Sequence, residues 1–276
     1  MAVLADCHMH SSFSGDSEAP MEKMADQACS IGLNDICFTE HMDLDYPNGA
    51  AGDEELPPDY FEVDMNKYTE KISQVQKEYS DRINIGYGLE FGLSSGRENR
   101  YIEIASSYDF DFIIGSTHLC HNKDITWPSF WNLKSEEELF GDYFDESLDN
   151  IRRNKCFDVY GHLDYIVRYA PNKDKNYIYS RYSDTIDEML KKIISLGKGI
   201  EINTKGKRCG LNEMNPCADI LKRYNELGGE IVTVGSDAHI PSDVGALIDD
   251  AGSILSSCGF RYYAVYHKHK PEMHKI

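Results

Sequence analysis

The sequence lacks several features that would assign it to common protein classes. No run of apolar residues approaches the length of about 20 that a membrane-spanning helix needs. The N-terminus has neither the basic nor the apolar region of a secretory signal peptide. The eight cysteines form no CxxC pair, and a disulfide framework is not expected in a domain this large, so we interpret them as buried reduced thiols. These absences predict a soluble cytoplasmic protein.

Basic residues are also scarce. The chain has 28 Lys and Arg against 47 Asp and Glu, which gives a formal net charge of −19. This charge opposes binding to a nucleic-acid backbone or to an anionic membrane, so neither is expected as a partner. A small phosphate ester is still compatible, because bound metals and a few local cations can reverse the field at a site. The oligomeric state is left open by the sequence.

No Pro/Gly/Ser-rich linker, fixed-period repeat or low-complexity tract divides the 276 residues. A chain of this length forms one large α/β domain or two ordinary ones. Candidate functional residues are spread from residue 8 to residue 239, so we predict a single domain over residues 1–276. The stretch 43–59, rich in Gly, Pro and acids, is interpreted as a surface loop over the site.

Segments typical of strands alternate with segments typical of helices. Runs typical of strands lie near residues 2–8, 34–40, 83–90, 110–117, 156–162, 199–203 and 230–236. Runs typical of helices lie near residues 20–31, 60–81, 97–107, 135–154, 180–196, 216–228 and 242–257. The alternation indicates parallel strands covered by helices, in a closed barrel or an open doubly wound sheet. Residues 261–266 look like a further strand, followed by a solvated terminus.

Seven of the strand-like segments end in a histidine, a carboxylate or both. An open sheet has its site between a few strands, whereas this distribution favours a closed ring whose strand ends meet at one mouth. Imidazoles and carboxylates in such number suit divalent metals better than a lone acid–base pair. The residues concerned are His8 and His10, Glu40 and His41, Glu90, His118, His162, Glu201 and Asn203, and Asp237 and His239.

Structural roles compete with metal binding at several of these positions. His8 and His10 point to the same side of their strand, because side chains alternate with period two. Asp16 lies in a Ser/Gly loop, where its alternative role is that of a turn former or helix cap. By the same alternation only one of Glu40 and His41 points inward. We select His41, which leaves Glu40 as an outward-facing, solvated acid.

Glu90 follows a Gly-x-Gly-Leu segment, where its carboxylate could bridge two metals through its two oxygens. Its alternative is an ion pair with Arg97 or Arg100. His118 and His162 follow small residues that leave room for a ligand. For each of these two histidines the alternative is simple burial with satisfied hydrogen bonds.

Together these motifs carry a family resemblance. The set consists of Asp6-x-His8-x-His10, Asp16, Thr39-Glu40-His41, Glu90, His118, Gly161-His162 and Gly235-Ser236-Asp237-x-His239. In this order it resembles the polymerase-and-histidinol-phosphatase (PHP) superfamily, and within it the monofunctional histidinol-phosphate phosphatases. The resemblance spans nearly the whole chain. It implies a distorted (β/α)7 barrel with a metal site at the C-terminal face of the strands.

The resemblance also implies three divalent metals. The first would be held by His8, His10, Glu90 and Asp237, the second by Glu90, His118 and His162, and the third by Asp16, His41 and His239. Some relatives have a histidine where Asp16 stands here. This departure shifts the expected preference of the third site toward iron or manganese rather than zinc. The choice among Zn, Mn and Fe is therefore left open.

The activity implied is that of an L-histidinol-phosphate phosphatase, which releases L-histidinol and phosphate in histidine biosynthesis. A hydroxide held between the metals would attack phosphorus in line, with Glu90 among the catalytic residues. The leaving alkoxide needs a proton or metal stabilisation, and Asp237 or His239 acting through a bound water are the candidate donors. Acids of the 43–59 loop would complement the cationic amine: Asp43, Asp45, Asp53 and Glu54.

Two arginines are candidates for the substrate phosphate. Arg208 follows the Glu-x-Asn-Thr motif at residues 201–204, and its planar guanidinium can grip two phosphate oxygens. The alternative is a surface basic cluster of Lys205, Lys207 and Arg208. Arg168, shortly after His162, is the second choice.

Two other functions compete with this one. One is a PHP phosphoesterase that acts on nucleotides, oligonucleotide ends or phosphotyrosine. The other is a non-catalytic, metal-binding scaffold, like the PHP modules found inside polymerases. The full set of candidate ligands argues against the scaffold.

Overall fold

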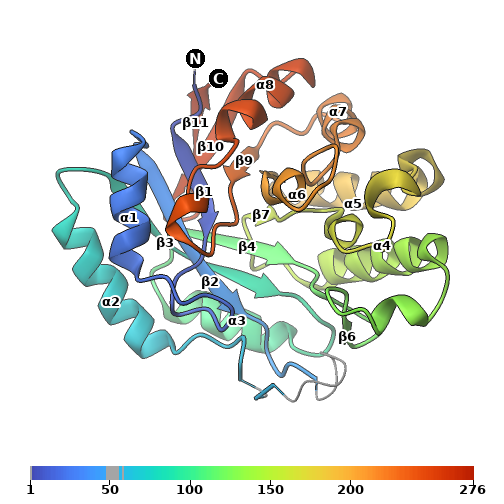
Figure 1. The fold of residues 1–276 in the computed structure, drawn as a ribbon, viewed down its shortest axis with the longest axis horizontal. Coiled ribbons are helices and arrows are strands. Elements are labelled where there is room, and N and C mark those ends of the chain that lie inside the picture. The colour runs from blue at the N-terminus through green and yellow to red at the C-terminus, as the bar shows by residue number, and fades with distance from the viewer. Residues whose placement is uncertain (1, 48–55, 58) are drawn as a thin grey trace.

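The computed structural model describes residues 2–47, 56–57 and 59–276. A ring of parallel strands lies in the middle of the molecule, with helices packed around it (Figure 1). The strands, in their order around the sheet, are β1 (Ala5–Met9), β2 (Asp35–Met42), β3 (Asn84–Gly92), β4 (Phe112–Ser116), β7 (Val159–Tyr160), β8 (Gly199–Asn203) and β9 (Val232–Gly235). Each neighbouring pair is parallel.

The two edges of this sheet meet. Asp237 N donates to His8 O at 2.7 Å, and His10 N donates to Ala238 O at 2.8 Å. The segment after β9 therefore continues the hydrogen bonding of β1, and the sheet is nearly closed into a barrel. The predicted barrel of seven parallel strands is confirmed.

Helices connect the successive strands and cover the outside of the barrel (Figure 1). They are α1 (Met21–Ser30), α2 (Met65–Glu78), α3 (Glu98–Ser107), α4 (Glu136–Arg153), α5 (Ser183–Ser195), α6 (Lys205–Arg208), α7 (Ala218–Glu226) and α8 (Ile248–Ser257). Short 3-10 turns are η1 (Phe130–Asn132), η2 (Tyr165–Arg168), η3 (Lys173–Lys175), η4 (Tyr179–Arg181) and η5 (Pro241–Asp243). All of the α-helices except α6 fall inside the helix-like runs.

Burial explains why the strand sequences lack simple alternation. Every residue of β2 and of β8 is buried, because one face of each strand fills the barrel and the other packs against the helices. The helices bury only one face, and in α5 that face consists of Ile186, Met189, Leu190 and Ile193. The longest helix, α4, begins with a capping box in which Ser135 and Glu138 satisfy each other's backbone N–H groups.

The C-terminal segment differs from the expected solvated terminus. β10 (Tyr262–His267) and β11 (Lys270–Lys275) form an antiparallel hairpin. His269 in its turn donates its backbone N–H to Asp111 O at 2.9 Å, and its Nδ1 lies 2.8 Å from Asp158 Oδ2. The sequence did not reveal β11, because none of its residues is buried and its lysines are exposed. A second hairpin, β5 (Leu119–Cys120) with β6 (Lys123–Asp124), was also not predicted.

Two other expectations can be compared with the described part of the chain. All eight cysteines are free thiols, and five of them are buried. No helix among the described residues is both long and apolar enough to cross a membrane. Of the proposed loop over the site, residues 48–55 and 58 lie outside the described part of the chain. Asp53 and Glu54, two of the acids expected to face the substrate amine, are among these undescribed residues.

Candidate metal centre

The nine predicted metal ligands lie together at the C-terminal ends of the strands. β1 provides His8, β2 provides His41 and β3 provides Glu90. The remaining residues follow strands directly or lie in the loop after β1: His10, Asp16, His118, His162, Asp237 and His239. Since parallel strands direct their carboxyl ends to one mouth, residues more than 200 positions apart in the sequence become neighbours.

Glu90 is at the centre of this arrangement. Its Oε1 lies 2.8 Å from His162 Nε2 and 3.3 Å from His118 Nε2. Its Oε2 lies 3.2 Å from His8 Nε2 and 3.5 Å from His10 Nε2. Burial acts to raise the pKa of this carboxyl, but the imidazoles of His8 and His118 hold the pKa well below its ordinary value. The two oxygens of the carboxylate thus face different groups of imidazoles, as those of a bridging ligand do.

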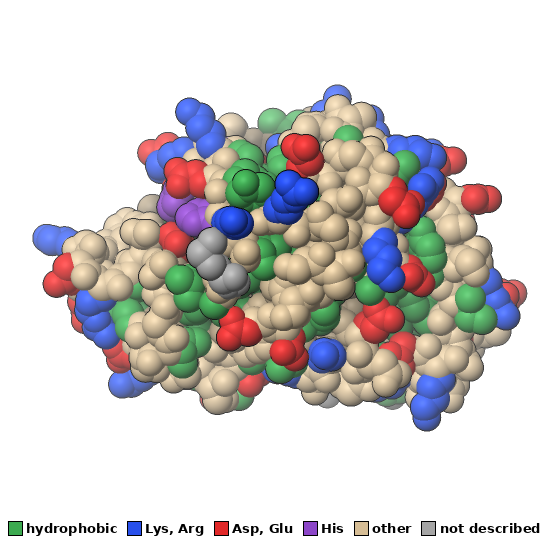
Figure 2. Space-filling model, turned by 90° about the horizontal axis from the view of Figure 1, so that it is seen from above, with side chains coloured by type: hydrophobic (Ala, Val, Ile, Leu, Met, Phe, Trp, Pro, Cys, Tyr) green, Lys and Arg blue, Asp and Glu red, His purple; other side chains and the backbone are tan. Residues whose placement is uncertain are grey.

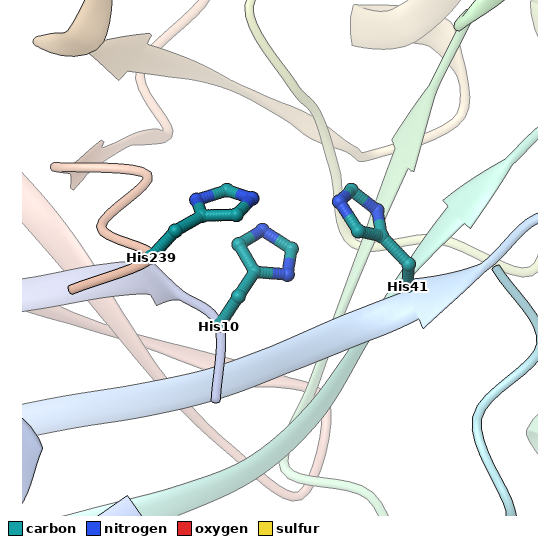
Figure 3. A group of neighbouring side chains, drawn as sticks. All are labelled: His10, His41 and His239. Atoms are coloured by element: carbon teal, nitrogen blue, oxygen red, sulfur yellow. The ribbon is translucent and has the colours of Figure 1, made fainter. Parts of the chain in front are cut away.

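A second group of imidazoles lies toward the cavity. His10, His41 and His239 come from different elements and point toward one another (Figure 3). Asp16 faces two of them, with its Oδ2 3.1 Å from His239 Nε2 and 3.6 Å from His41 Nε2. Burial acts to lower the pKa of His41, but Asp16 and Glu90 raise it to about 10. Asp16 therefore contacts the two histidines with which it was grouped.

The donor atoms fit divalent metal ions. His8 Nε2 and His10 Nε2 face each other at 3.1 Å, which brings two imidazole nitrogens to one point. His41 Nδ1 is buried and makes no hydrogen bond, although it lies 3.2 Å from Glu90 Oε2. Four overlapping trios have their ligand atoms within 4.8 Å of one another: His8, His10 and Glu90; His41, Glu90 and His118; His8, His162 and Asp237; His10, His41 and His239. Imidazole and carboxylate donors at such spacing suit Zn, Mn or Fe.

Further residues orient these imidazoles through their outer ring nitrogens. Glu201 Oε1 lies 2.7 Å from His8 Nδ1, and its other oxygen accepts from His162 N at 3.0 Å. Asp43 Oδ2 lies 2.7 Å from His118 Nδ1. A carboxylate behind a metal-binding histidine fixes its tautomer and raises its basicity. The sequence placed Glu201 at a strand end but gave no sign of this supporting role, which depends on the neighbouring strands.

The interpretation of Glu40 as a solvated acid is wrong. This side chain is fully buried, and its carboxylate accepts hydrogen bonds from Ser11 N at 3.1 Å and Ser14 Oγ at 2.5 Å. Alternation does turn Glu40 away from His41. However, the loop after β1 covers that side of β2, so the acid holds the loop in place instead of facing water.

The two predicted phosphate ligands are both engaged elsewhere. Arg168 is fully buried, and its Nη1 donates to Asp237 Oδ2 at 2.8 Å while its Nη2 donates to Asn203 Oδ1 at 3.0 Å. Arg208 donates to Asp243 and to the carbonyl of Ser236. Neither guanidinium lines the cavity formed by the described residues. Their physical role in this structure is to hold the loops around Asp237.

A cavity of about 320 Å³ opens in front of the histidines. Aromatic side chains form part of its wall, among them Trp127, Tyr165 and Tyr169. Its charged lining is mostly acidic and consists of Asp16, Asp43, Glu90, Asp124, Asp237 and Lys205. On the molecular surface, histidine side chains are visible beside acidic side chains (Figure 2). The cavity can hold a small molecule with a cationic or aromatic part.

The chain is similar to several known proteins. A family model described as PHP domain matches residues 6–205. A probable histidinol-phosphatase from Clostridium acetobutylicum is 33% identical over 262 residues, which is 94% of this chain and 95% of that protein. The histidinol-phosphatase of Lactococcus lactis subsp. lactis is 31% identical over 271 residues, or 98% of this chain and 97% of that protein.

Solved structures agree with the sequence comparisons. The crystal structure of histidinol phosphate phosphatase from Lactococcus lactis, complexed with zinc, L-histidinol and phosphate, superposes with a TM-score of 0.85 at 30% identity. The superposition covers 98% of this chain and 99% of the Lactococcus lactis chain. The structure of a putative histidinol phosphatase from Listeria monocytogenes shares the fold, with a TM-score of 0.71 at 17% identity. This superposition covers 88% of this chain and 97% of the Listeria chain.

Proposed function

This chain belongs to the PHP domain family, and we propose that it is a metal-dependent phosphomonoesterase that hydrolyses L-histidinol phosphate to L-histidinol and phosphate. The observation that carries the proposal is the likeness, over nearly the full length of both chains, to the Lactococcus lactis enzyme that binds zinc, L-histidinol and phosphate. The convergence of imidazoles on the two oxygens of Glu90 supports it independently.

We further propose that three divalent metals bind, with the ligands grouped as the family resemblance implies. Glu90 would bridge the first two sites, and Asp16, His41 and His239 would form the third. Metals at such a donor set lower the pKa of coordinated water and polarise a phosphoryl oxygen. Whether zinc, manganese or iron is preferred depends most on Asp16, whose hard oxygen replaces an imidazole nitrogen at the third site.

The protein side chains supply orientation and proton transfer. Glu201 and Asp43 hold the rings of His8 and His118 from behind, so that the ligand nitrogens stay directed at Glu90. His239 lines the cavity, and with Asp237 it remains our candidate to deliver a proton, through water, to the departing alkoxide.

Arg208 and Arg168 remain in the proposal as phosphate ligands. Direct contact would require Arg208 to leave Asp243 and the carbonyl of Ser236. Arg168 would have to leave Asp237 in the same way.

The cavity lining supports histidinol phosphate over more anionic esters. Asp43 Oδ1 is buried without a hydrogen-bond partner, and a substrate ammonium at this oxygen would satisfy it. Asp124 lies nearby, where its Oδ2 accepts from Tyr46 OH at 2.7 Å. The rings of Trp127 and Tyr165 can pack against an imidazole. A nucleotide would bring additional negative charge to this acidic wall, so we rank that alternative second.

Phosphate release from L-histidinol phosphate tests the proposal. Protein loaded with zinc or manganese should release inorganic phosphate, chelation should abolish the release, and returning the metal should restore it. Metal-loaded protein that leaves histidinol phosphate intact while it hydrolyses a nucleotide or phosphotyrosine would overturn the substrate assignment. Activity that survives complete metal removal would overturn the mechanism.

A further inference from the structure

We propose that Lys205 binds the phosphate group of the substrate; this inference rests on the proposed phosphatase function. Lys205 is the first residue of α6, and only Thr204 separates it from the end of β8. Among the described residues it is the only Lys or Arg that lines the cavity. Its Nζ donates to Asp237 Oδ1 at 3.0 Å and lies 3.2 Å from His239 Nδ1, beside two predicted metal ligands.

The charge of the cavity explains why this ammonium is needed. Five carboxylates line the wall: Asp16, Asp43, Glu90, Asp124 and Asp237. A phosphate monoester carries close to two negative charges at neutral pH, so it meets repulsion wherever metals do not face it. The guanidiniums of Arg168 and Arg208 are held by other partners. Lys205 is therefore the cation already at the place where the ester must arrive.

The backbone around Lys205 is fixed, while its side chain keeps freedom to move. Lys205 N donates to Asn203 Oδ1 at 3.0 Å, and Thr204 N donates to Gly235 O at 2.9 Å. A Cβ on Gly206 would lie 2.4 Å from Asn215 Oδ1, so α6 can approach this close only with glycine there. The lysine side chain is 23% exposed, and its four-carbon stem lets the ammonium turn from Asp237 to a phosphate oxygen.

A purely structural role for Lys205 predicts different measurements. If the lysine only neutralised Asp237, its removal would weaken metal binding through that carboxylate and would leave phosphate affinity at full metal occupancy unchanged. If it binds phosphate, its removal weakens phosphate binding although the metals stay in place. Metal content and phosphate affinity must therefore be measured on the same samples.

The experiment uses metal-loaded protein in three variants: Lys205→Ala, Lys205→Arg and the matched control Lys207→Ala. Lys207 is on the same short helix, where its Nζ lies 3.8 Å from Asp250 Oδ2. Calorimetry gives the affinity for inorganic phosphate, elemental analysis gives metal per chain, and kinetics give KM for histidinol phosphate. Lys205→Ala should weaken phosphate binding about tenfold or more, as expected for a lost charge-assisted hydrogen bond, and should raise KM in parallel.

The controls decide between the interpretations. Lys205→Arg should keep most of the phosphate affinity, Lys207→Ala should behave as the unchanged protein, and the affinity for L-histidinol, which has no phosphate, should be the same in all. Unchanged phosphate affinity in Lys205→Ala, or a loss that follows a loss of metal, would overturn the proposal. Inorganic phosphate binds whichever ester is hydrolysed, so this result is independent of whether histidinol phosphate proves to be the substrate.

Discussion

At the scale of single residues, Glu90 is central to the proposed metal centre. Its two oxygens face five histidines, each at 3.5 Å or less. Glu90→Gln keeps the shape of the side chain but removes its charge and one of its anionic oxygens. We expect turnover to fall by orders of magnitude and metal content to drop, while circular dichroism stays unchanged. A variant with near-normal activity and full metal content would exclude the bridging role.

Asp43 carries the second prediction at this scale. One of its oxygens lies against His118, and the other is the buried atom that we assign to the substrate amine. Asp43→Asn should raise KM for histidinol phosphate about tenfold, the usual size of a lost hydrogen bond to a charged group. An analogue that lacks the amino group separates the two contacts. If KM rises equally for both compounds, Asp43 acts only through His118.

The sequence revealed those site residues that strand periodicity and position determine. His8, His10 and Glu90 follow from strand ends that meet at one mouth. Contacts between loops of distant segments could not be derived in this way. Glu40 is buried by Ser11 and Ser14, which lie 26 or more positions earlier in the chain. Loop packing likewise directs Arg208 to Asp243. It also leaves Lys205 as the cation that lines the cavity formed by the described residues.

At the scale of elements, the alternation of strands and helices predicted parallel strands covered by helices. The histidines and carboxylates after nearly every strand then favoured a closed barrel over an open sheet. β8 occupies the predicted range, and β1 is displaced by a few residues. The predicted elements were wrong where a strand is very short or exposed. β7 has only two residues, far fewer than the predicted run, and the exposed strand β11 was not predicted. A solvated face carries polar residues whether or not the segment pairs with another strand. Local pattern therefore could not distinguish a hairpin from a terminus.

The docking of the β10–β11 hairpin should depend on pH. The hydrogen bond with Asp158 raises the pKa of His269 above its ordinary value, against the opposing effect of partial burial. Lys198 acts to lower this pKa and Asp111 to raise it. A histidine whose pKa is raised by folding stabilises the fold fully below its unfolded value of about 6.5 and loses that effect as pH rises through the folded value.

Urea unfolding at pH 6 and pH 8 measures this effect. The side chain of His269 is 41% exposed, so solvent screening limits its contribution to about 0.5 kcal/mol. His269→Gln should remove this contribution from the difference in the free energy of unfolding between pH 6 and pH 8. His267→Gln, two residues earlier in the hairpin, is the control and should keep it. Equal pH dependence in the unchanged protein and in His269→Gln would contradict the assignment.

At the scale of the whole molecule, the metals should link distant parts of the chain. The predicted ligands come from β1, β2, β3 and the segments after β1, β4, β7 and β9. Ions bound only by the folded state stabilise it by mass action, by about 2.7 kcal/mol at a concentration of 100 times the dissociation constant. Chelation should therefore lower the unfolding temperature, and returning zinc or manganese should raise it. An unfolding temperature that is insensitive to chelation would contradict this coupling.

The number of metals is a separate prediction at this scale. Protein prepared without chelator should contain about three ions per chain at the strand ends, as the family pattern implies. Elemental analysis gives the number, and anomalous scattering gives the positions. A single mononuclear site would contradict the grouping of the ligands around Glu90 and Asp16.

The most direct test of the account is the specificity of the metal-loaded enzyme. Values of kcat/KM for L-histidinol phosphate, a nucleoside monophosphate and phosphotyrosine should be measured on one preparation by release of inorganic phosphate. The acidic, aromatic cavity predicts that histidinol phosphate is preferred by at least about 100-fold, the combined effect of its amine and imidazole contacts. Equal values for the three esters, or a preference for either of the others, would contradict the proposed function.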